Sequence, residues 1–155
     1  MAAYSFKSVG KTREQIAEET PEVSRIPFGI KTPLALGTSE GIFAMNYSLA
    51  DQFADNLKNL LLTNWGERLG HYDFGANLKP LTSEFVSQDS FDTEAIDRIR
   101  NAVQKWMPFI DLEDFSSTVD RIENKNTAII KITITYNIPA LEVTKKSLQI
   151  VLYVM

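Results

Sequence analysis

The sequence predicts an α+β protein in which two amphipathic helices pack on an antiparallel C-terminal β-meander and an extended N-terminal arm precedes them. Three observations lead to this prediction. Apolar residues recur at helical spacing in residues 48–63 and 91–107, and they alternate with polar residues after residue 127. The first 47 residues contain three prolines and four glycines, which favour extended and turn structure. Helices followed by neighbouring antiparallel strands are typical of the α+β class, with the helices on one face of the sheet.

The N-terminal arm is expected to span residues 1–47. Its last part, "GIKTPLALGTSEGIFAMNY", is predicted to form a short strand or hairpin because turn residues separate two apolar stretches. The far N-terminus is a candidate for ordering only against a neighbouring protein. Residues 48–155 are predicted to form a single α+β domain.

The first helix is expected in "SLADQFADNLKNLLLT". Ser48 followed three residues later by Asp51 resembles a capping box and marks the helix start. Asn64 and Gly66 are expected to end the helix, since a left-handed residue closes many helices. One face of the helix carries Leu49, Phe53, Leu57, Leu60 and Leu61.

The second helix is expected in "FDTEAIDRIRNAVQKWMP", with Asp92 or Thr93 as its cap. Pro108 should stop it at or before Met107, because the residue before a proline is driven toward extended geometry. Its predicted buried stripe consists of Ile96, Ile99, Val103 and Trp106.

Three strands are expected after the second helix. "SSTVDRI" and "TAIIKITITYNI" form a hairpin through the polar turn "ENKN", and "SLQIVLYVM" returns as the third strand. The middle strand alternates, with one face formed by Ala128, Ile130, Ile132, Ile134, Tyr136 and Ile138. The last strand is interpreted as a sheet edge that a neighbour's strand can extend. Its core face is predicted to carry Leu148, Ile150, Leu152 and Val154, and its outward face Gln149, Val151 and Tyr153.

Composition excludes several classes of protein. The chain of 155 residues is 44% apolar, which suits one globular domain with a real core. It has no cysteine and one histidine, so disulfides, thiol nucleophiles and multi-histidine zinc sites are excluded. Residues 36–90 carry three basic and seven acidic side chains, which argues against binding nucleic acid. The sequence has no signal-peptide pattern and no apolar run long enough for a membrane, so a cytosolic chain is expected.

The stretch "LLLTNWGERLGHYDFGANL", residues 60–78, gathers the polar groups that could support chemistry. Glu67 and Asp73 could flank a glycosidic bond as a carboxylate pair, but two acids so close in sequence are common on surface loops. His71 has no partner nucleophile, and the glycines match no phosphate-binding pattern. The stretch is therefore interpreted as a structural elbow, with no catalytic residue, no cofactor and no metal.

Within the elbow, we expect particular roles for individual residues. Glu67 should act in a cap or ion pair, and carboxylates or carbonyls should hold Arg68. Gly66 and Gly75 should be required for backbone geometry that a Cβ atom would strain. The aromatic residues are expected to pack the elbow against the helices; they are Trp65, Tyr72 and Phe74.

At these residues the sequence resembles the gene-25-type baseplate wedge family of contractile phage tails, which is also called lysozyme-like. Members carry a leucine helix, a Thr-x-x-Gly-Glu-Arg turn, a Phe-Gly-x-x-Leu step and a helix that ends in Trp-Glu-Pro-Arg-Ile. The resemblance covers residues 42–138. The residues that match in order and spacing are Leu61, Leu62, Thr63, Gly66, Glu67, Arg68, Phe74, Gly75 and Leu78.

The resemblance implies a structural role without enzymatic activity. It implies a subunit present in several copies around the tail axis, assembled in the host cytoplasm and residing in the virion tail baseplate. Its implied partners are other wedge proteins, tail sheath subunits whose assembly it initiates, and hub or tube proteins as further candidates. Neither nucleic acid nor a membrane is an expected partner. Two alternatives stay open: the equivalent subunit of a phage-like injection or secretion machine, and a peptidoglycan glycosidase.

The chain departs from the family pattern at one segment. Where the family has Glu-Pro-Arg after the tryptophan, here Trp106, the chain has Met107, Pro108 and Phe109. The resemblance implies that the family segment touches the helical core bundle of the wedge through its charges. In this chain the contact is either apolar, with Met107 and Phe109 as anchors, or displaced to another surface. Alternatively, both side chains simply join the core.

Overall fold

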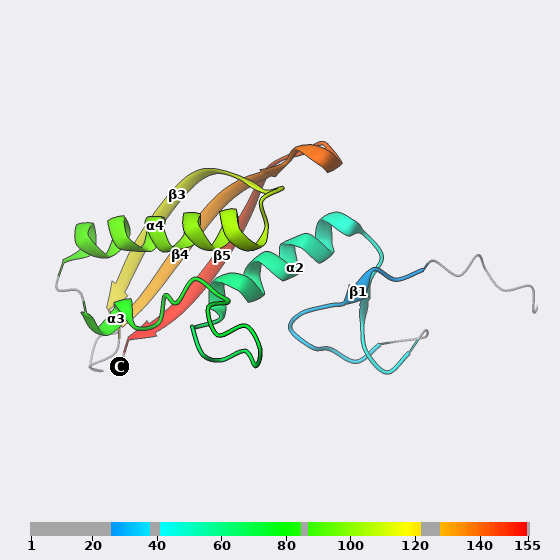
Figure 1. The fold of residues 1–155 in the computed structure, drawn as a ribbon, viewed down its shortest axis with the longest axis horizontal. Coiled ribbons are helices and arrows are strands. Elements are labelled where there is room, and N and C mark those ends of the chain that lie inside the picture. The colour runs from blue at the N-terminus through cyan, green and yellow to red at the C-terminus, as the bar shows by residue number, and fades with distance from the viewer. Residues whose placement is uncertain (1–25, 38–40, 85–86, 122–127, 155) are drawn as a thin grey trace, which may run out of the picture.

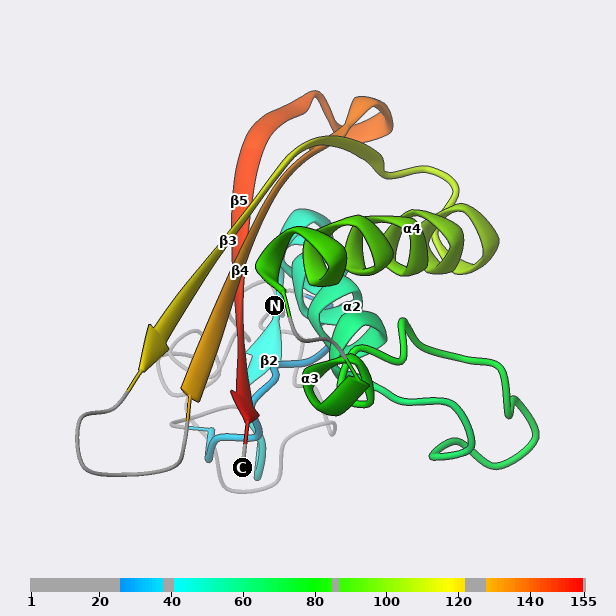
Figure 2. The ribbon, with the colours of Figure 1, turned by 90° about the vertical axis from the view of Figure 1, so that its left-hand side faces the viewer.

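A three-stranded antiparallel sheet covered on one face by helices forms the body of the protein. The computed structural model describes residues 26–37, 41–84, 87–121 and 128–154. The helices are α2 (Leu49–Leu62), the short α3 (Leu81–Glu84) and α4 (Gln88–Trp106). Figure 2 shows α2 and α4 on the same side of the sheet, and Figure 1 shows β1, in the described part of the arm, to one side of this body. The predicted α+β class is confirmed.

The sheet has the strand order β3-β4-β5. Its strands are β3 (Asp111–Arg121), β4 (Ala128–Ile138) and β5 (Val143–Val154), and the turn η1 (Pro139–Leu141) joins the last two. Both pairings are antiparallel, as the alternating sequence predicts. The last strand is an edge strand as expected, and β3 is a second edge that sequence reasoning did not consider. The predicted turn at residues 123–126 lies outside the described residues.

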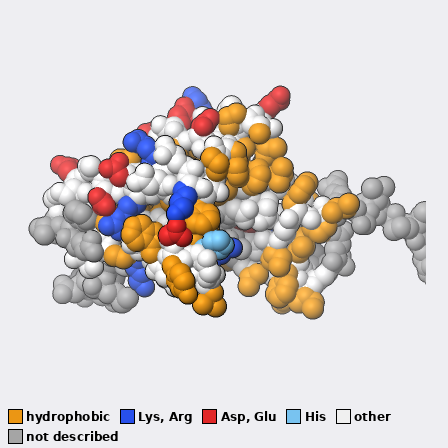
Figure 3. All heavy atoms as spheres, in the orientation of Figure 1, with side chains coloured by type: hydrophobic (Ala, Val, Ile, Leu, Met, Phe, Trp, Pro, Cys, Tyr) orange, Lys and Arg blue, Asp and Glu red, His pale blue; other side chains and the backbone are white. Residues whose placement is uncertain are grey.

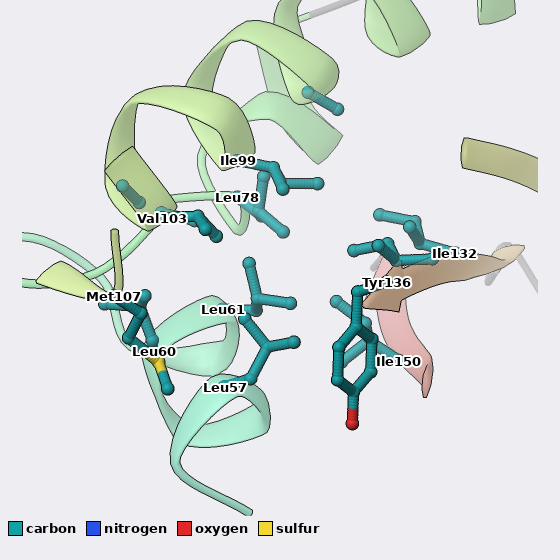
Figure 4. Packing of buried hydrophobic residues seen from close by; sticks show 14 of the residues in the cluster. Leu57, Leu60, Leu61, Leu78, Ile99, Val103, Met107, Ile132, Tyr136 and Ile150 are labelled. Atoms are coloured by element: carbon teal, nitrogen blue, oxygen red, sulfur yellow. The ribbon is translucent and has the colours of Figure 1, made fainter. Parts of the chain in front are cut away.

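The hydrophobic core lies between the sheet and the two long helices. Alternate residues of β4 from Ile130 to Ile138 are buried, which is the face predicted from the sequence. Figure 4 shows Tyr136 and Ile150 of the sheet facing Leu57 and Leu61 of α2. Burial, together with the nearby Asp51 and Asp55, raises the pKa of the Tyr136 hydroxyl.

Both long helices differ from expectation at their ends. Ser48 precedes α2 as its N-cap residue, but its side chain makes no capping hydrogen bond. The helix ends at Leu62, where Thr63 is extended and its hydroxyl donates to the Asn59 carbonyl at 2.6 Å. The expected left-handed closure at Asn64 or Gly66 is therefore wrong, since a side-chain hydroxyl already satisfies a terminal carbonyl.

Helix α4 begins at Gln88, earlier than the predicted cap at Asp92 or Thr93. The Ser87 hydroxyl accepts a hydrogen bond from the Ser90 amide at 3.4 Å, so Ser87 is the cap. The earlier start brings Phe91 onto the buried face, which also contains Ala95 and Ala102. Of the predicted stripe, Ile99 and Val103 are buried, and Ile96 and Trp106 are only half-buried. Pro108 stops the helix at Trp106 as expected.

The described part of the arm is a small hairpin. Strands β1 (Gly29–Ile30) and β2 (Met45–Asn46) pair antiparallel, and Leu36 forms a bridge with Phe43. This agrees with the predicted hairpin, while the expectation for the far N-terminus lies outside the described residues. Hydrophobic side chains gather on the surface of this hairpin (Figure 3). The large exposed ones are Ile26, Phe28, Ile30, Leu34, Leu36, Ile42 and Phe43.

A polar contact joins the hairpin to α2. The Asp55 carboxylate accepts from the Thr32 amide at 2.9 Å and from Asn46 Nδ2 at 2.7 Å. Asn46 also donates to Gln52 at 3.2 Å, and it is buried. We call this group, formed by Thr32, Asn46, Gln52 and Asp55, the polar latch.

In the described ranges, no helix is both long and apolar enough to cross a bilayer.

Candidate functional site

The elbow at residues 60–78 is a series of tight turns between α2 and α3. The Gly66 amide donates to the Tyr72 carbonyl at 2.7 Å and closes the loop. Gly66 and Gly70 have φ angles of 86° and 80°, a region that side chains with a Cβ atom rarely adopt. The backbone geometry expected at Gly66 is confirmed.

Gly75 lies where the elbow returns to the end of α2. Its φ is 110°, and a Cβ atom there would overlap the Thr63 carbonyl oxygen. The same carbonyl accepts from the Asn77 amide at 3.3 Å, so the two backbone segments are in direct contact. Only glycine allows this approach, as the sequence analysis expected.

The two acidic side chains of the elbow are each engaged locally. The Glu67 carboxylate accepts from the Asn64 side-chain amide and from its backbone amide, both at 2.8 Å. These bonds lower the pKa of Glu67. Asp73 forms an ion pair with Lys105, which lowers the pKa of Asp73. Glu67 is thus the capping residue that the sequence indicated.

Arg68 has different surroundings from those expected. Its guanidinium lies 4.4 Å from the centre of the Phe74 ring. Among the described residues, no carboxylate or carbonyl pairs with this guanidinium, and the side chain is exposed. The expectation of a local carboxylate partner is therefore wrong, because the elbow acids are bound to Asn64 and Lys105 instead.

The aromatic residues of the elbow divide into two groups. Phe74 is half-buried and packs edge-on against Trp106 with 5.2 Å between the ring centres, as expected. Trp65 is 57% exposed but contacts α4 through Arg98, whose guanidinium lies 5.8 Å from the centre of the Trp65 ring; Tyr72 is 67% exposed, so the predicted packing against the helices is wrong for Tyr72. The indole of Trp65 also donates to the Gly75 carbonyl at 3.0 Å. The exposed His71 packs edge-on against Trp106 at 5.4 Å.

A groove of about 810 Å³ opens beside the elbow, and we call it the elbow groove. It lies between the C-terminal half of α2, the elbow and the residues that follow α4. Its apolar lining is formed by Leu60, Phe74, Trp106, Met107 and Phe109. Its polar lining is formed mainly by Asn56, Asn59, Glu67 and Arg68. Asn56 and Asn59 carry no direct signal in the sequence, although both lie on the same flank of the leucine face.

In the segment after α4, Met107 and Phe109, which stand where the family has charged residues, differ in burial. Met107 is only 6% exposed and belongs to the core, as one of the open interpretations stated. Phe109 is 39% exposed, and its ring contacts Phe53 with 4.6 Å between the centres. Pro108, between them, is exposed. Phe109 therefore remains accessible at the groove, while Met107 lines it from the core side.

Both sheet edges have one register shift, between Leu112 and Asp114 on β3 and between Tyr136 and Ile138 in the β4–β5 pairing, and on β3 a carboxylate also accepts from a main-chain amide. On β5, the pairing with β4 is continuous from Lys146 to Val154, and the outward Gln149, Val151 and Tyr153 are exposed as predicted. On β3, the register shifts between Leu112 and Asp114. There the Asp114 carboxylate accepts from the Phe115 amide at 2.9 Å. A bulge and an inserted carboxylate make an edge less receptive to an added strand.

Within the described residues, no cluster of three or more His, Asp or Glu side chains could hold a metal ion. The groups that gather at the described elbow are amides, the locally bonded carboxylates Glu67 and Asp73, the Arg68 guanidinium and aromatic rings. These are groups suited to recognising a protein surface.

Comparison with known proteins gives similarity at the level of the fold. No family model and no curated protein matches the sequence. One similar structure is a chain of the anti-feeding prophage (AFP) baseplate, with 18% identity and a TM-score of 0.57; the match covers 70% of this chain and 82% of that chain. Another is a Geobacter sulfurreducens protein provisionally described as a tail lysozyme, with 19% identity and a TM-score of 0.47. That match covers 68% of this chain and 89% of the other.

Proposed function

We propose that this chain is a structural subunit of the baseplate of a contractile tail or of a related contractile injection particle. The observation that carries the proposal is the fold shared with a chain of the AFP baseplate over 82% of that chain's length. The elbow pattern that resembles the baseplate wedge family, from Leu61 to Leu78, supports it independently. Several copies would surround the tail axis, in a baseplate assembled in the host cytoplasm.

At a finer level, we propose a wedge role in which the elbow groove docks on a neighbouring wedge protein. Phe109 supports this role because a large aromatic ring at a groove rim is a frequent anchor of protein interfaces. The groove volume is in the range of sites that take several side chains. Hub or tube proteins are further candidate partners.

A second proposed contact is the β5 edge, which would accept a strand from a sheath subunit and so initiate the sheath. Its support is one local difference between the edges: both have a register shift, but on β3 the Asp114 carboxylate already accepts from the Phe115 amide. Regular edges offer a continuous row of main-chain donors and acceptors to an added strand.

We further propose that the chain has no enzymatic activity. The competing glycosidase reading requires a carboxylic acid that stays protonated near neutral pH, and such an acid needs a raised pKa. The pKa values of Glu67 and Asp73 are both lowered by their local partners, which disfavours either as the acid. Purified protein should therefore release no reducing sugar from peptidoglycan, and turnover lost in a folded Glu67→Gln variant would contradict this proposal.

The test of the baseplate proposal is to isolate contractile particles from cells that encode this chain and to locate an epitope-tagged copy. Immunogold electron microscopy should place the label at the baseplate end of the sheath. Particles that contain no copy of the chain, or label along the whole sheath, would overturn the proposal. The presence or absence of a capsid on the labelled particles decides between a phage tail and an injection machine.

A further inference from the structure

We propose that the elbow groove binds a partner segment that carries apolar side chains beside a carboxylate, and that Arg68 pairs with that carboxylate. This inference rests on the proposed docking role of the groove and adds the chemistry of the partner. It assigns Arg68 as the residue that selects the partner and Phe109 as an apolar anchor.

The first step of the argument is the lining of the groove. Five apolar side chains, from Leu60 on α2 to Phe109 after α4, face one open space of about 810 Å³. Such a lining favours apolar side chains, because the burial of apolar surface contributes about 25 cal/mol of binding free energy per Å² removed from water. A small hydrophilic anion would leave most of this lining in water.

The second step is the charge balance at the rim. Glu67 is held by the Asn64 amides, and Asp73 is paired with Lys105. Arg68 has only the face of Phe74 at 4.4 Å, and no described carboxylate reaches it. The groove lining therefore holds one carboxylate, Glu67, which already accepts two hydrogen bonds, and one guanidinium, Arg68, which has no carboxylate partner among the described residues.

The third step is the geometry of the guanidinium. The cation–π contact with Phe74 involves no hydrogen-bond acceptor, and among the described residues no carboxylate or carbonyl pairs with the guanidinium, so its N–H groups are available. Those N–H groups match a carboxylate through two parallel hydrogen bonds, a pairing that lysine does not reproduce. Stacking also restricts the side chain before binding, which reduces the entropy lost when a partner carboxylate pairs with it.

Nucleic acid also offers anions, but the surroundings of Arg68 do not suit it. Residues 36–90, which include the elbow, carry seven acidic and three basic side chains. A nucleic-acid surface requires several cations along a backbone. One cation beside an apolar groove instead matches an acidic segment of a protein.

The experiment is a selection from displayed amphipathic peptides whose apolar positions are fixed and whose polar positions vary among Glu, Gln, Lys and Ser. The target is the full chain, immobilised through an affinity tag. We expect winning peptides to be enriched in Glu next to an apolar residue. We also expect a winning peptide to bind at least about tenfold more tightly than its Glu→Gln version, consistent with one charge-assisted bond.

Variants test whether the preference for Glu depends on Arg68 itself or on the positive charge of the protein in general. Arg68→Gln should abolish the preference for Glu, and Arg68→Lys should retain only part of it. Arg100→Gln, which removes an exposed arginine of α4 outside the elbow groove, should leave the preference unchanged. Circular dichroism of each variant checks that the fold is retained.

Several results would overturn the inference. These are a selection without any binder, winners without acidic residues, winners rich in Lys, or an unchanged Glu preference in Arg68→Gln. Failure of the baseplate proposal is distinguishable, because it would be seen as the absence of the chain from contractile particles. If the chain is present in particles and the selection shows no acidic preference, the inference fails and the baseplate proposal remains.

Discussion

At the scale of single residues, the elbow depends on backbone positions that accept no side chain. Gly75 combines a φ of 110° with a position where an added Cβ would overlap the Thr63 carbonyl oxygen, whereas Gly70 has a φ of 80° and open space where its Cβ would lie. The two glycines therefore allow conformational strain to be separated from steric overlap.

We expect Gly75→Val to reduce the unfolding free energy by more than about 1 kcal/mol and by more than Gly70→Val does. The valine at position 75 would meet the Thr63 carbonyl in addition to the unfavourable φ, and the valine at position 70 would meet only the second penalty. Urea denaturation of both variants measures the difference. Equal losses in the two variants would show that the close contact at Gly75 has no energetic weight.

The Glu67 carboxylate should give the protein a small, defined dependence on pH. Its pKa in the folded state is lowered from the ordinary value of 4.5. A lowered folded-state pKa contributes stability that is present above pH 4.5 and is lost as the pH falls through the folded-state pKa. We expect the stability difference between wild type and Glu67→Gln to shrink over this acid range, as thermal unfolding at several pH values can measure. A difference that stays constant with pH would contradict the capping role.

At the scale of elements, the segment after α4 and the edge of β5 are the parts that we propose for contacts. Val119 on β3 is a control position for both, because its side chain is similarly exposed. Val119 is 38% exposed, Phe109 is 39% exposed and Val151 is 36% exposed. Val119 does not line the elbow groove, and it lies on the other sheet edge.

We expect Phe109→Asp to leave a soluble, folded monomer that no longer joins the wedge. An unpaired charge placed in a docked apolar groove costs about 2–5 kcal/mol, because the carboxylate loses water without gaining a partner. Val119→Asp should fold and assemble normally, and Met107→Asp should unfold because Met107 is in the core. Co-purification with baseplates and thermal melting are the readouts. Unfolding of Phe109→Asp alone would mean that its contact with Phe53 is structural.

We expect Val151→Pro to produce baseplates that carry little sheath. Proline removes one main-chain donor and is tolerated best at sheet edges, so the fold should survive while strand addition fails. The matched Val119→Pro change alters the other edge and should leave the sheath intact. Electron microscopy should show naked tubes on finished baseplates only for Val151→Pro. Sheaths of normal length on those tails would exclude β5 as the template.

Much of the fold is predictable because the periodicities are strong. The alternation of β4 predicts its buried face, and the leucine spacing of α2 predicts the helix that covers it. The sequence prediction starts α4 too late, because Ser87 is followed three residues later by Ser90 and not by the Glu or Gln of a capping box, which makes its signal weak. The elbow groove was not predictable, because Leu60, Phe74 and Phe109 meet only in the folded chain. That no described carboxylate pairs with Arg68 was not predictable either, because it depends on the same tertiary arrangement.

At the scale of the whole molecule, the arm and the body are joined by the polar latch. The latch contains three hydrogen bonds, to Asp55 and Gln52 of α2, while the large apolar side chains of the described hairpin are exposed. The arm is thus oriented by specific polar bonds, and it adds little to the core.

We expect Asp55→Ala to loosen the arm without unfolding the body. Removing the carboxylate leaves the Thr32 amide and the Asn46 side chain without their acceptor. Hydrogen exchange at residues 28–46 should accelerate, and the melting temperature of the body should change little. Asp51→Ala is the control, since Asp51 forms an exposed ion pair with Lys146 outside the latch. Global unfolding of Asp55→Ala would show that the arm is part of the cooperative unit.

The inequality of the two sheet edges also limits what the chain can build from itself. A polymer grows only when each unit both receives and offers a binding end, and a head-to-tail contact that does not close produces a filament. Both edges keep a regular stretch of pairing, from Asp114 to Arg121 on β3 and from Lys146 to Val154 on β5, but on β3 the Asp114 carboxylate already accepts from the Phe115 amide. That carboxylate disfavours a second copy at the β3 edge, so we expect copies that add a strand at β5 to start another protein's array more readily than a fibre of their own.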